Sequence, residues 1–156
     1  FDRLQIALAE ARRYRRRMAL LFLDLDGFKE VNDRLGHEGG DQVLLETGRR
    51  LQAAVRGCDT VARLGGDEFT VILGNVDGER NVSLVAERLL ADISAPISTR
   101  SGICRVGASI GISMFPEDGA DSDTLLKRAD LAMYGVKHRG KNGYMGFMEP
   151  EVRAVA

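Results

Sequence analysis

The feature that most limits the fold of this chain is a Gly-Gly-Asp-Glu tetrad between two short apolar runs. The run 61–64 precedes the tetrad at 65–68, and the run 69–73 follows it. Glycine tolerates the positive φ of tight turns, so the pattern predicts a β-hairpin. Two adjacent carboxylates in a packed hairpin repel each other and lose hydration, so they need protonation, an arginine or a divalent cation.

Length and charge restrict the protein class. A chain of 156 residues fits one domain and is long enough to bury about two thirds of its extended surface. Its 22 basic and 23 acidic side chains produce no global field that would attract nucleic acid or an anionic membrane. We therefore expect no nucleic-acid partner, although the arginines between residues 12 and 17 form a solvated basic cluster.

The two cysteines and the absence of targeting signals suggest a compartment. Neither Cys58 nor Cys104 has a histidine at metal-ligand spacing, so the sequence predicts neither a zinc site nor a disulfide framework. No apolar run is long enough to span a membrane, and no cleavable signal is evident. We expect a reducing, cytoplasmic location for this domain. The chain begins at Phe1, which suggests a piece of a longer protein whose other parts sit elsewhere, a membrane included.

Hydrophobic periodicity predicts an α+β fold with a central mixed, mostly antiparallel sheet flanked by helices. Helices are expected over 1–17, from 28 to 35 with Gly36 closing it, from there to about 55, over 79–92 and over 122–138. Strands are expected over 18–25, 61–64, 69–73 and 144–147, and the segment 97–114 suggests a further hairpin.

An acid-rich segment follows the first expected strand. Asp24 lies at the end of the apolar run, and pairing of that strand with the hairpin would bring it close to Asp67 and Glu68. Such an oxygen-rich cluster suits Mg²⁺ or Mn²⁺. The backbone N–H groups of residues 26–28, at a helix start, would form an anion cradle beside the metal. The alternative is a polar strand end beside a surface turn.

Two further groups allow two interpretations each. Asn32 and Asp41 have side chains that can read a guanine edge, but Asp41 can equally be a helix N-cap and Asn32 a solvated side chain. Lys137 and Lys141, near the end of the last expected helix, either complement the helix macrodipole or hold a triphosphate.

These residues resemble the GGDEF family of diguanylate cyclases over nearly the whole chain. The signature stands intact at Gly65 to Phe69. The other matching segments are Asp24 to Asp33, Gly36 with His37, Gly40 with Asp41, Ala129 to Tyr134 and Lys137 to Asn142.

The resemblance implies a palm-like nucleotidyl cyclase fold, an enzyme that condenses two GTP molecules into cyclic di-GMP and two pyrophosphates, and a homodimer with one GTP per subunit. It assigns catalysis to Asp67 and Glu68, and metal binding to these two with Asp24 and the carbonyl of Leu25. The substrate-binding residues carried over with it are Asp26, Gly27, Phe28, Lys29, Asn32, His37, Asp41, Lys137 and Lys141.

The segment from Arg56 to Asp59 matches the RxxD pattern of the family's inhibitory product site. The alternative is a surface ion pair at a helix end, which contributes little energy.

Departures and competing functions complete the prediction. Lys141 stands where the family usually has arginine, and Gly135 interrupts the last helix. Residues 1–148 are expected to form the cyclase domain and 149–156 a tail or the start of a linker to a phosphodiesterase domain, with a sensor elsewhere. The alternatives to an active cyclase are a weakly active GTP-binding module that regulates the phosphodiesterase, and a cyclic di-GMP receptor.

Overall fold

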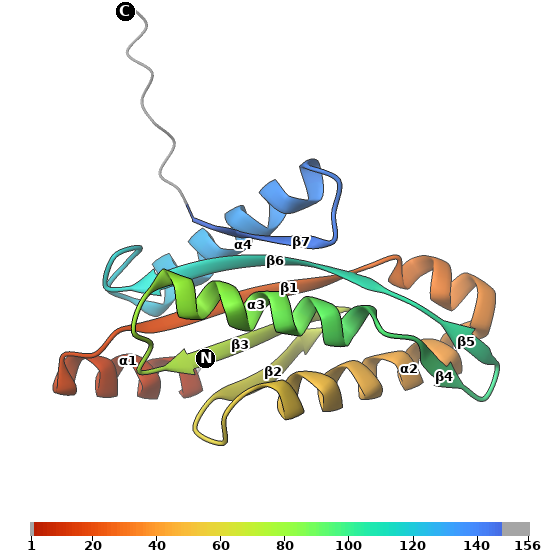
Figure 1. Ribbon diagram of the computed structural model, residues 1–156, viewed down its shortest axis with the longest axis horizontal. Helices are drawn as coiled ribbons and strands as arrows, with labels where there is room; N and C mark the ends of the chain where they lie inside the picture. Colours follow the sequence, from red (N-terminus) through yellow and green to blue (C-terminus); the bar gives the residue numbers. More distant parts are fainter. Residues whose placement is uncertain (1, 148–156) are drawn as a thin grey trace, which may run out of the picture.

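A mixed sheet of five strands forms the centre of the molecule, in the order β2-β3-β1-β6-β7 (Figure 1). The structure is a computed structural model and describes residues 2–147, so the expected tail lies outside the described residues. The strands are β1 Met18–Asp26, β2 Thr60–Gly65, β3 Glu68–Gly74, β6 Gly107–Phe115 and β7 Gly143–Gly146. All neighbours are antiparallel except β6 and β7, which confirms the mixed, mostly antiparallel sheet.

Four helices cover the two faces of this sheet. They are α1 Asp2–Tyr14, α2 Phe28–Ala54, α3 Glu79–Ser94 and α4 Ser122–His138. One apolar core lies between the sheet and the helices α2 and α3. A second core lies between the sheet and the helices α1 and α4. The α+β class predicted from periodicity is therefore correct.

Strand β1 contributes to both cores because successive side chains point to opposite faces. Its odd-numbered residues, such as Leu21 and Leu23, pack in the core under α2 and α3. Its even-numbered residues from Met18 to Phe22 pack in the core under α1 and α4. The same period places Asp24 and Asp26 on the face of α4, where the apolar row ends.

Helix α2 changes direction at Gly36, as the sequence predicts. Gly36 has φ 74° and ψ 171°, a conformation that glycine adopts without strain. The following helical segment already includes Asp41, so Asp41 lies inside a helix. The alternative interpretation of Asp41 as an N-cap is therefore wrong, because the helix begins at the kink.

The hairpin expected over 97–114 is shorter than that range. Strands β4 Ile97–Thr99 and β5 Gly102–Cys104 form a separate two-stranded sheet. The residues from Gly107 onward instead pair with β1 along its whole length. The β-branched and glycine-rich composition of the segment does not distinguish these two pairings.

Helix α4 makes close contact with β6 at Gly111. A Cβ atom at this position would lie 1.9 Å from the Ala129 carbonyl oxygen and 2.2 Å from the Met133 nitrogen. Only a glycine allows the helix backbone to approach the strand this closely. This contact fixes the height of α4 above the sheet, and therefore the place of the lysine at its end.

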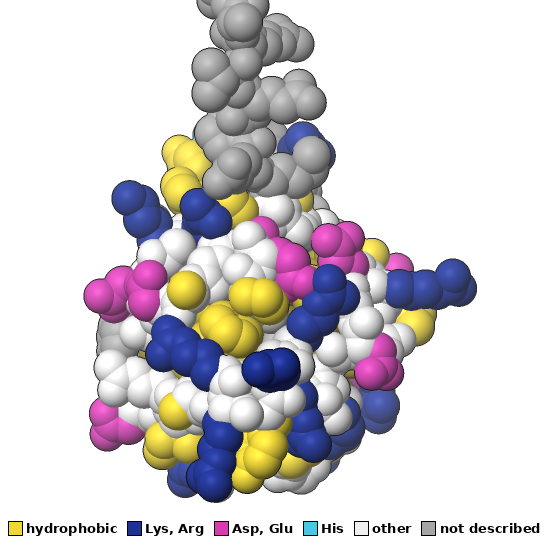
Figure 2. All heavy atoms as spheres, turned by 90° about the vertical axis from the view of Figure 1, so that its left-hand side faces the viewer, with side chains coloured by type: hydrophobic (Ala, Val, Ile, Leu, Met, Phe, Trp, Pro, Cys, Tyr) yellow, Lys and Arg dark blue, Asp and Glu magenta, His cyan; other side chains and the backbone are white. Residues whose placement is uncertain are grey.

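The basic cluster lies at the turn between α1 and β1. Figure 2 shows Lys and Arg side chains spread over this side of the molecule. Arg17 forms an ion pair with Glu117, and Tyr14 lies 5.4 Å from the guanidinium of Arg13 and 5.3 Å from that of Arg16. The cluster is exposed, as expected for a solvated helix end. Within residues 2–147, no helix combines the length and apolar character needed to cross a membrane.

Candidate active site

The acids of the first strand and of the hairpin meet at one end of the sheet. Asp24 of β1 lies opposite Glu68 of β3 in the antiparallel register. Directly opposed residues share a face, so both side chains lie on the α4 side. The register confirms the expectation that β1 pairs beside the hairpin and brings Asp24 close to its acids.

The turn of the hairpin is held by backbone and side-chain hydrogen bonds. The Leu25 nitrogen donates to the Asp67 carbonyl oxygen at 3.2 Å, which joins the turn to β1. The Arg63 Nε donates to the Gly66 carbonyl oxygen at 2.9 Å. Gly66 has φ 51°, so a glycine relieves strain at this point. These contacts fix the backbone positions of Asp67 and Glu68.

Lys137, in the last turn of α4, binds Asp24. Its Nζ lies 2.6 Å from the Asp24 Oδ1, and the exposed fractions of the two side chains are 31% and 13%. This confirms that the end of α4 lies beside the first strand. The lysine therefore does more than complement the helix macrodipole, because it neutralises an acid of the site.

The electrostatic balance of the cluster is negative. Burial raises the pKa of Glu68, and the charges of Asp24 and Asp67 raise it further. Burial also raises the pKa of Asp24, in spite of its hydrogen bond with Lys137. Burial alone would lower the pKa of Lys137, but its bond to Asp24 raises it. Burial is the main cause of the raised pKa values, and Lys137 brings one positive charge to a site that contains the carboxylates of Asp24, Asp67 and Glu68.

This donor set fits a divalent metal in its chemistry. Carboxylate and carbonyl oxygens are the ligands that Mg²⁺ and Mn²⁺ prefer, and the excess of negative charge favours a cation. Among residues 2–147, however, no three acidic, histidine or cysteine side chains are gathered closely enough to hold a metal ion by themselves. Lys137 occupies one oxygen of Asp24 in this arrangement. The metal ligands named from the sequence therefore stay a prediction.

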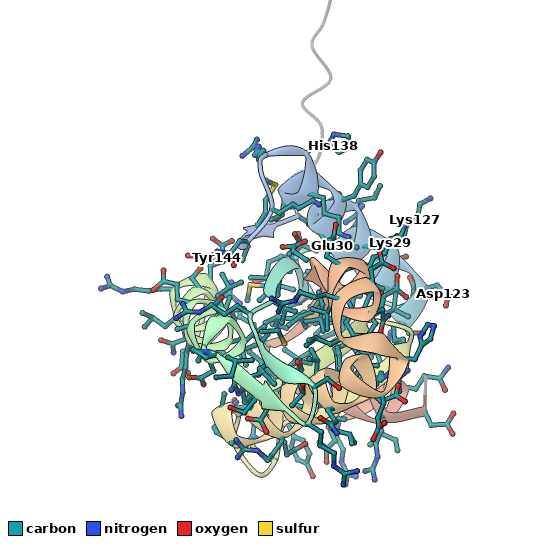
Figure 3. The ribbon with its side chains drawn as sticks, turned by 90° about the vertical axis from the view of Figure 1, so that its right-hand side faces the viewer. Lys29, Glu30, Asp123, Lys127, His138 and Tyr144 are labelled. Atoms are coloured by element: carbon teal, nitrogen blue, oxygen red, sulfur yellow. The ribbon has the colours of Figure 1, made fainter. Side chains whose placement is uncertain are left out.

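The start of α2 offers free backbone donors next to these acids. Gly27 is the N-cap with φ 81°, and no side chain caps this helix end. The first N–H groups of a helix have no partner within the helix, so they favour an anion. Asp26 itself belongs to β1, so the cradle begins at Gly27. Figure 3 shows Lys29 and Glu30 at the start of α2, below the end of α4 that carries His138.

The residues proposed to read guanine lie along α2. Asn32 is half-buried, and a Cβ atom at Gly40 would lie 1.8 Å from its Oδ1, so Asn32 packs directly over Gly40. Asp41 lines a hollow of about 630 Å³ between α2 and the strands β2 and β3. The structure thus brings Asn32 next to the residue that precedes Asp41. His37 is exposed just after the kink.

The RxxD segment forms a local network. The buried Asp59 side chain, 2% exposed, accepts hydrogen bonds from the Arg56 nitrogen, the Arg56 guanidinium and the Gly74 nitrogen. The Arg56 guanidinium also donates to the Gly74 carbonyl oxygen. The pair is therefore more than a surface ion pair, since it ties the end of α2 to the end of β3.

Asp26 has partners that sequence reasoning missed. Its carboxylate accepts hydrogen bonds from the Ser109 hydroxyl and from the Asn142 backbone nitrogen. Ser109 lies 83 residues away in sequence, so no local pattern connects the two. The role of Arg63 was missed for a different reason. Nothing in the sequence indicates that an exposed arginine in a strand donates a hydrogen bond to the backbone of the following turn.

The comparisons with known proteins agree with this geometry. A family model described as "Diguanylate cyclase, GGDEF domain" matches residues 1–143. The chain therefore belongs to the GGDEF family of diguanylate cyclase domains, and its sheet and helices form the palm-like fold of that family.

Among the relatives is the bifunctional diguanylate cyclase/cyclic di-GMP phosphodiesterase MucR of Pseudomonas aeruginosa, which is 46% identical over 99% of this chain and 22% of its own length. The chain thus spans about a fifth of that relative. The crystallised GGDEF domain of TpbB, also called YfiN, from the same organism superposes with a TM-score of 0.91 at 37% identity, over 96% of this chain and 93% of that one. The GGDEF domain of DgcB from Caulobacter crescentus, crystallised with c-di-GMP, has a TM-score of 0.83 at 28% identity, covering 93% and 86%.

Proposed function

We propose that this domain is a diguanylate cyclase that condenses two GTP molecules into cyclic di-GMP and two pyrophosphates. The observation that carries the proposal is the meeting of Asp24, Glu68 and Lys137 at one end of the sheet. A pair of acids with raised pKa values beside a lysine and an uncapped helix start suits a metal-bound triphosphate.

The proposed metal ligands are Asp24, the Leu25 carbonyl oxygen, Asp67 and Glu68. A bound Mg²⁺ or Mn²⁺ would polarise the α-phosphate and neutralise the charge of the departing pyrophosphate. Lys137 contacts only the Oδ1 of Asp24, so the Oδ2 can bind the metal directly, and Oδ1 can do so once the lysine has left it. In this proposal the lysine leaves Asp24 and binds a phosphate oxygen when the nucleotide arrives.

The other roles in the site are to bind and orient the GTP and to take a proton from its 3′-hydroxyl. Asp67 takes the proton of the 3′-hydroxyl, and Glu68 supports the same metal site. The phosphates contact the N–H groups at Gly27 and Phe28 and the ammonium groups of Lys29, Lys137 and Lys141. Asp41, which lines the hollow beside α2, reads the guanine edge together with Asn32, with His37 nearby.

Two domains are needed for turnover. One site holds one GTP, so the 3′-hydroxyl of each has to attack the α-phosphate of the other across a two-fold axis. The specific rate should therefore rise with protein concentration until the dimer is saturated. A specific rate independent of concentration would argue against the paired sites.

The direct test is to incubate the domain with GTP and Mg²⁺ and to separate the nucleotides by anion-exchange chromatography. We expect cyclic di-GMP and pyrophosphate, and no product after addition of a chelator or in Asp67→Ala. A control is Glu10→Gln, which changes an exposed acid on α1 outside the proposed site and should retain the activity.

A second candidate is a weakly active GTP-binding module that controls a fused phosphodiesterase. The ion pair between Lys137 and Asp24 favours it, because it competes with the metal. The relative MucR is named as a protein that combines both activities, so a phosphodiesterase domain and a sensor in the full-length protein are part of this proposal. Tight GTP binding without conversion in the same assay would support this candidate.

Feedback by the product is proposed at Arg56 and Asp59. The half-exposed Arg56 guanidinium lines a hollow of about 320 Å³ together with Arg88 and Asp77. An arginine grips the O6 and N7 atoms of guanine. We expect Arg56→Ala to relieve inhibition by cyclic di-GMP, and unchanged inhibition would refute this role.

A further inference from the structure

Asp26, the second acid of β1, forms hydrogen bonds with two other segments of the protein. The Asp26 Oδ1 and Oδ2 lie 2.9 and 3.0 Å from the Ser109 Oγ, and the Asp26 Oδ2 lies 2.8 Å from the Asn142 nitrogen. Ser109 is completely buried in β6. The carboxylate therefore connects the central strands to a loop that leaves the end of α4.

That loop has an unfavourable backbone conformation. Lys141 and Asn142 have φ values of 64° and 46°, so two successive residues with side chains adopt the left-handed region. The left-handed region is costly for Lys141, whereas asparagine adopts it more readily, so surrounding contacts have to hold Lys141 there. The loop turns back on α4 through the Lys141 nitrogen, which donates to the Val136 carbonyl oxygen. The Asn142 side chain packs over Gly107, where a Cβ atom would lie 3.0 Å from its Oδ1.

The loop carries a cation that is available for a ligand. The Lys141 side chain is exposed and forms no ion pair with any of the described residues. Asp26 is two residues from Asp24, which binds Lys137. The bond from the Asn142 nitrogen to Asp26 therefore holds the backbone of the loop that carries Lys141 at the end of β1, where the acids meet.

We infer that Asp26 is a positioning residue that holds the loop 139–143 in its left-handed conformation and so places Lys141 for a triphosphate. This role rests on the proposed function. Asp26 touches neither metal nor phosphate in this account, and it acts through the backbone of Asn142. Asp26 therefore has a different role from Asp24, although both side chains lie on the same face of β1.

The test compares Asp26→Ala with Asp26→Asn and Ser109→Ala. Alanine at 26 removes both acceptor oxygens, whereas asparagine can still accept from the Asn142 nitrogen through its Oδ1 and donate from its Nδ2 to the Ser109 hydroxyl. Alanine at 109 removes the hydroxyl and leaves the bond to the Asn142 nitrogen in place. Two quantities are measured: hydrogen exchange of the segment 139–143, and the affinity for tripolyphosphate with Mg²⁺, which requires no turnover.

We expect Asp26→Ala to accelerate amide exchange in 139–143 and to weaken tripolyphosphate binding by about 10-fold, the scale of a lost hydrogen bond to a charged group. In the cyclase assay it should raise KM for GTP with little change in kcat. Asp26→Asn should show the same pattern more weakly, because its Oδ1 still accepts from the Asn142 nitrogen. Ser109→Ala should stay within about 2-fold of wild type in both measurements, because the Ser109 hydroxyl contacts Asp26 and not the loop.

The inference is overturned if the loop exchanges at the wild-type rate in Asp26→Ala, or if Ser109→Ala weakens binding to the same extent. It is also overturned if kcat falls while KM and phosphate affinity stay constant. Failure of the proposed function looks different, because the wild-type domain itself then fails to convert GTP. In that case the exchange measurement still reports whether Asp26 holds the loop.

Discussion

Asp24 and Glu68 lie directly opposite each other on the adjacent strands β1 and β3, with both side chains on the same face of the sheet. Like charges at opposed positions destabilise a sheet by about 0.2–1 kcal/mol. Lys137 relieves this repulsion only in part, since the pKa of Glu68 is still raised by burial and by the two neighbouring aspartates. The domain keeps an unfavourable charge arrangement at the end of its central strand, which is typical of a binding site.

Glu68→Gln should therefore stabilise the metal-free domain. Removal of one of two opposed charges is expected to raise the free energy of unfolding by about 0.5 kcal/mol, measured by urea denaturation at pH 7. The pKa of Glu68 in the folded state lies above its unfolded value, so the folded protein binds the proton more tightly. The penalty from ionised Glu68 therefore grows as the pH rises through the folded pKa.

The pH dependence provides the control for this prediction. The gain from Glu68→Gln should shrink as the pH falls below the ordinary carboxyl pKa, because glutamate is then protonated in both states. The exposed Glu10, on α1, is a matched comparison, and Glu10→Gln should show no such trend. A gain that increases in acid would contradict the charge explanation.

Lys137→Met should separate metal binding from phosphate binding. Loss of the ammonium frees the Asp24 oxygen, so Mn²⁺ should bind the nucleotide-free domain more tightly, as monitored by electron paramagnetic resonance. The same variant should raise KM for GTP on the order of 10-fold, because a phosphate contact is lost. Lys141→Met should raise KM alone, since Lys141 has no bond to Asp24 in this structure. Equal Mn²⁺ affinity in all three proteins would rule out the exchange of partners by Lys137.

Gly40→Ala should displace Asn32. The added methyl group would lie 1.8 Å from the Asn32 Oδ1 and 3.3 Å from the Phe28 ring, so the side chains have to move. We expect a loss of stability of about 1–3 kcal/mol and a raised KM for GTP. Gly146→Ala meets open space and should leave both unchanged. Discrimination between GTP and inosine triphosphate, which lacks the guanine amino group, measures whether the base contact itself is affected.

Asp59→Ala should destabilise the domain by about 2–4 kcal/mol, because the backbone nitrogens of Arg56 and Gly74 and the Arg56 guanidinium lose their buried acceptor. Thermal unfolding measures this effect without any nucleotide. Its size means that Asp59 variants are unsuitable for testing product inhibition. If Asp59→Ala unfolds like wild type, the network around β3 is not structural.

Much of the fold follows from local patterns. The glycine tetrad predicts the hairpin of β2 and β3, and the apolar run predicts β1. The apolar stripes with helical spacing predict the helices. These elements lie where the sequence predicts them. The pairing of Asp24 with Glu68 also follows, because a doubly buried strand has few possible neighbours. By contrast, the composition of 97–114 does not reveal that β6 leaves the small hairpin and pairs with β1.

The sequence names candidate residues for the site, which stay a prediction, but it does not reveal their contacts. The bonds from Ser109 and Asn142 to Asp26 join segments that the chain brings together only after the sheet has formed. The bond between Lys137 and Asp24 depends on the angle at which α4 crosses the sheet. Such angles result from packing of whole surfaces, and no short motif encodes them.

The contact between Gly111 and α4 has a consequence for how this domain can diverge. A single hydrogen atom at position 111 sets the spacing of a helix and a strand, and the lysine that reaches Asp24 stands eight residues further along that helix than Ala129. Any larger side chain at position 111 would push α4 away from β6. Lys137 would then move away from Asp24, and the site would lose this ion pair although all of its residues were still present.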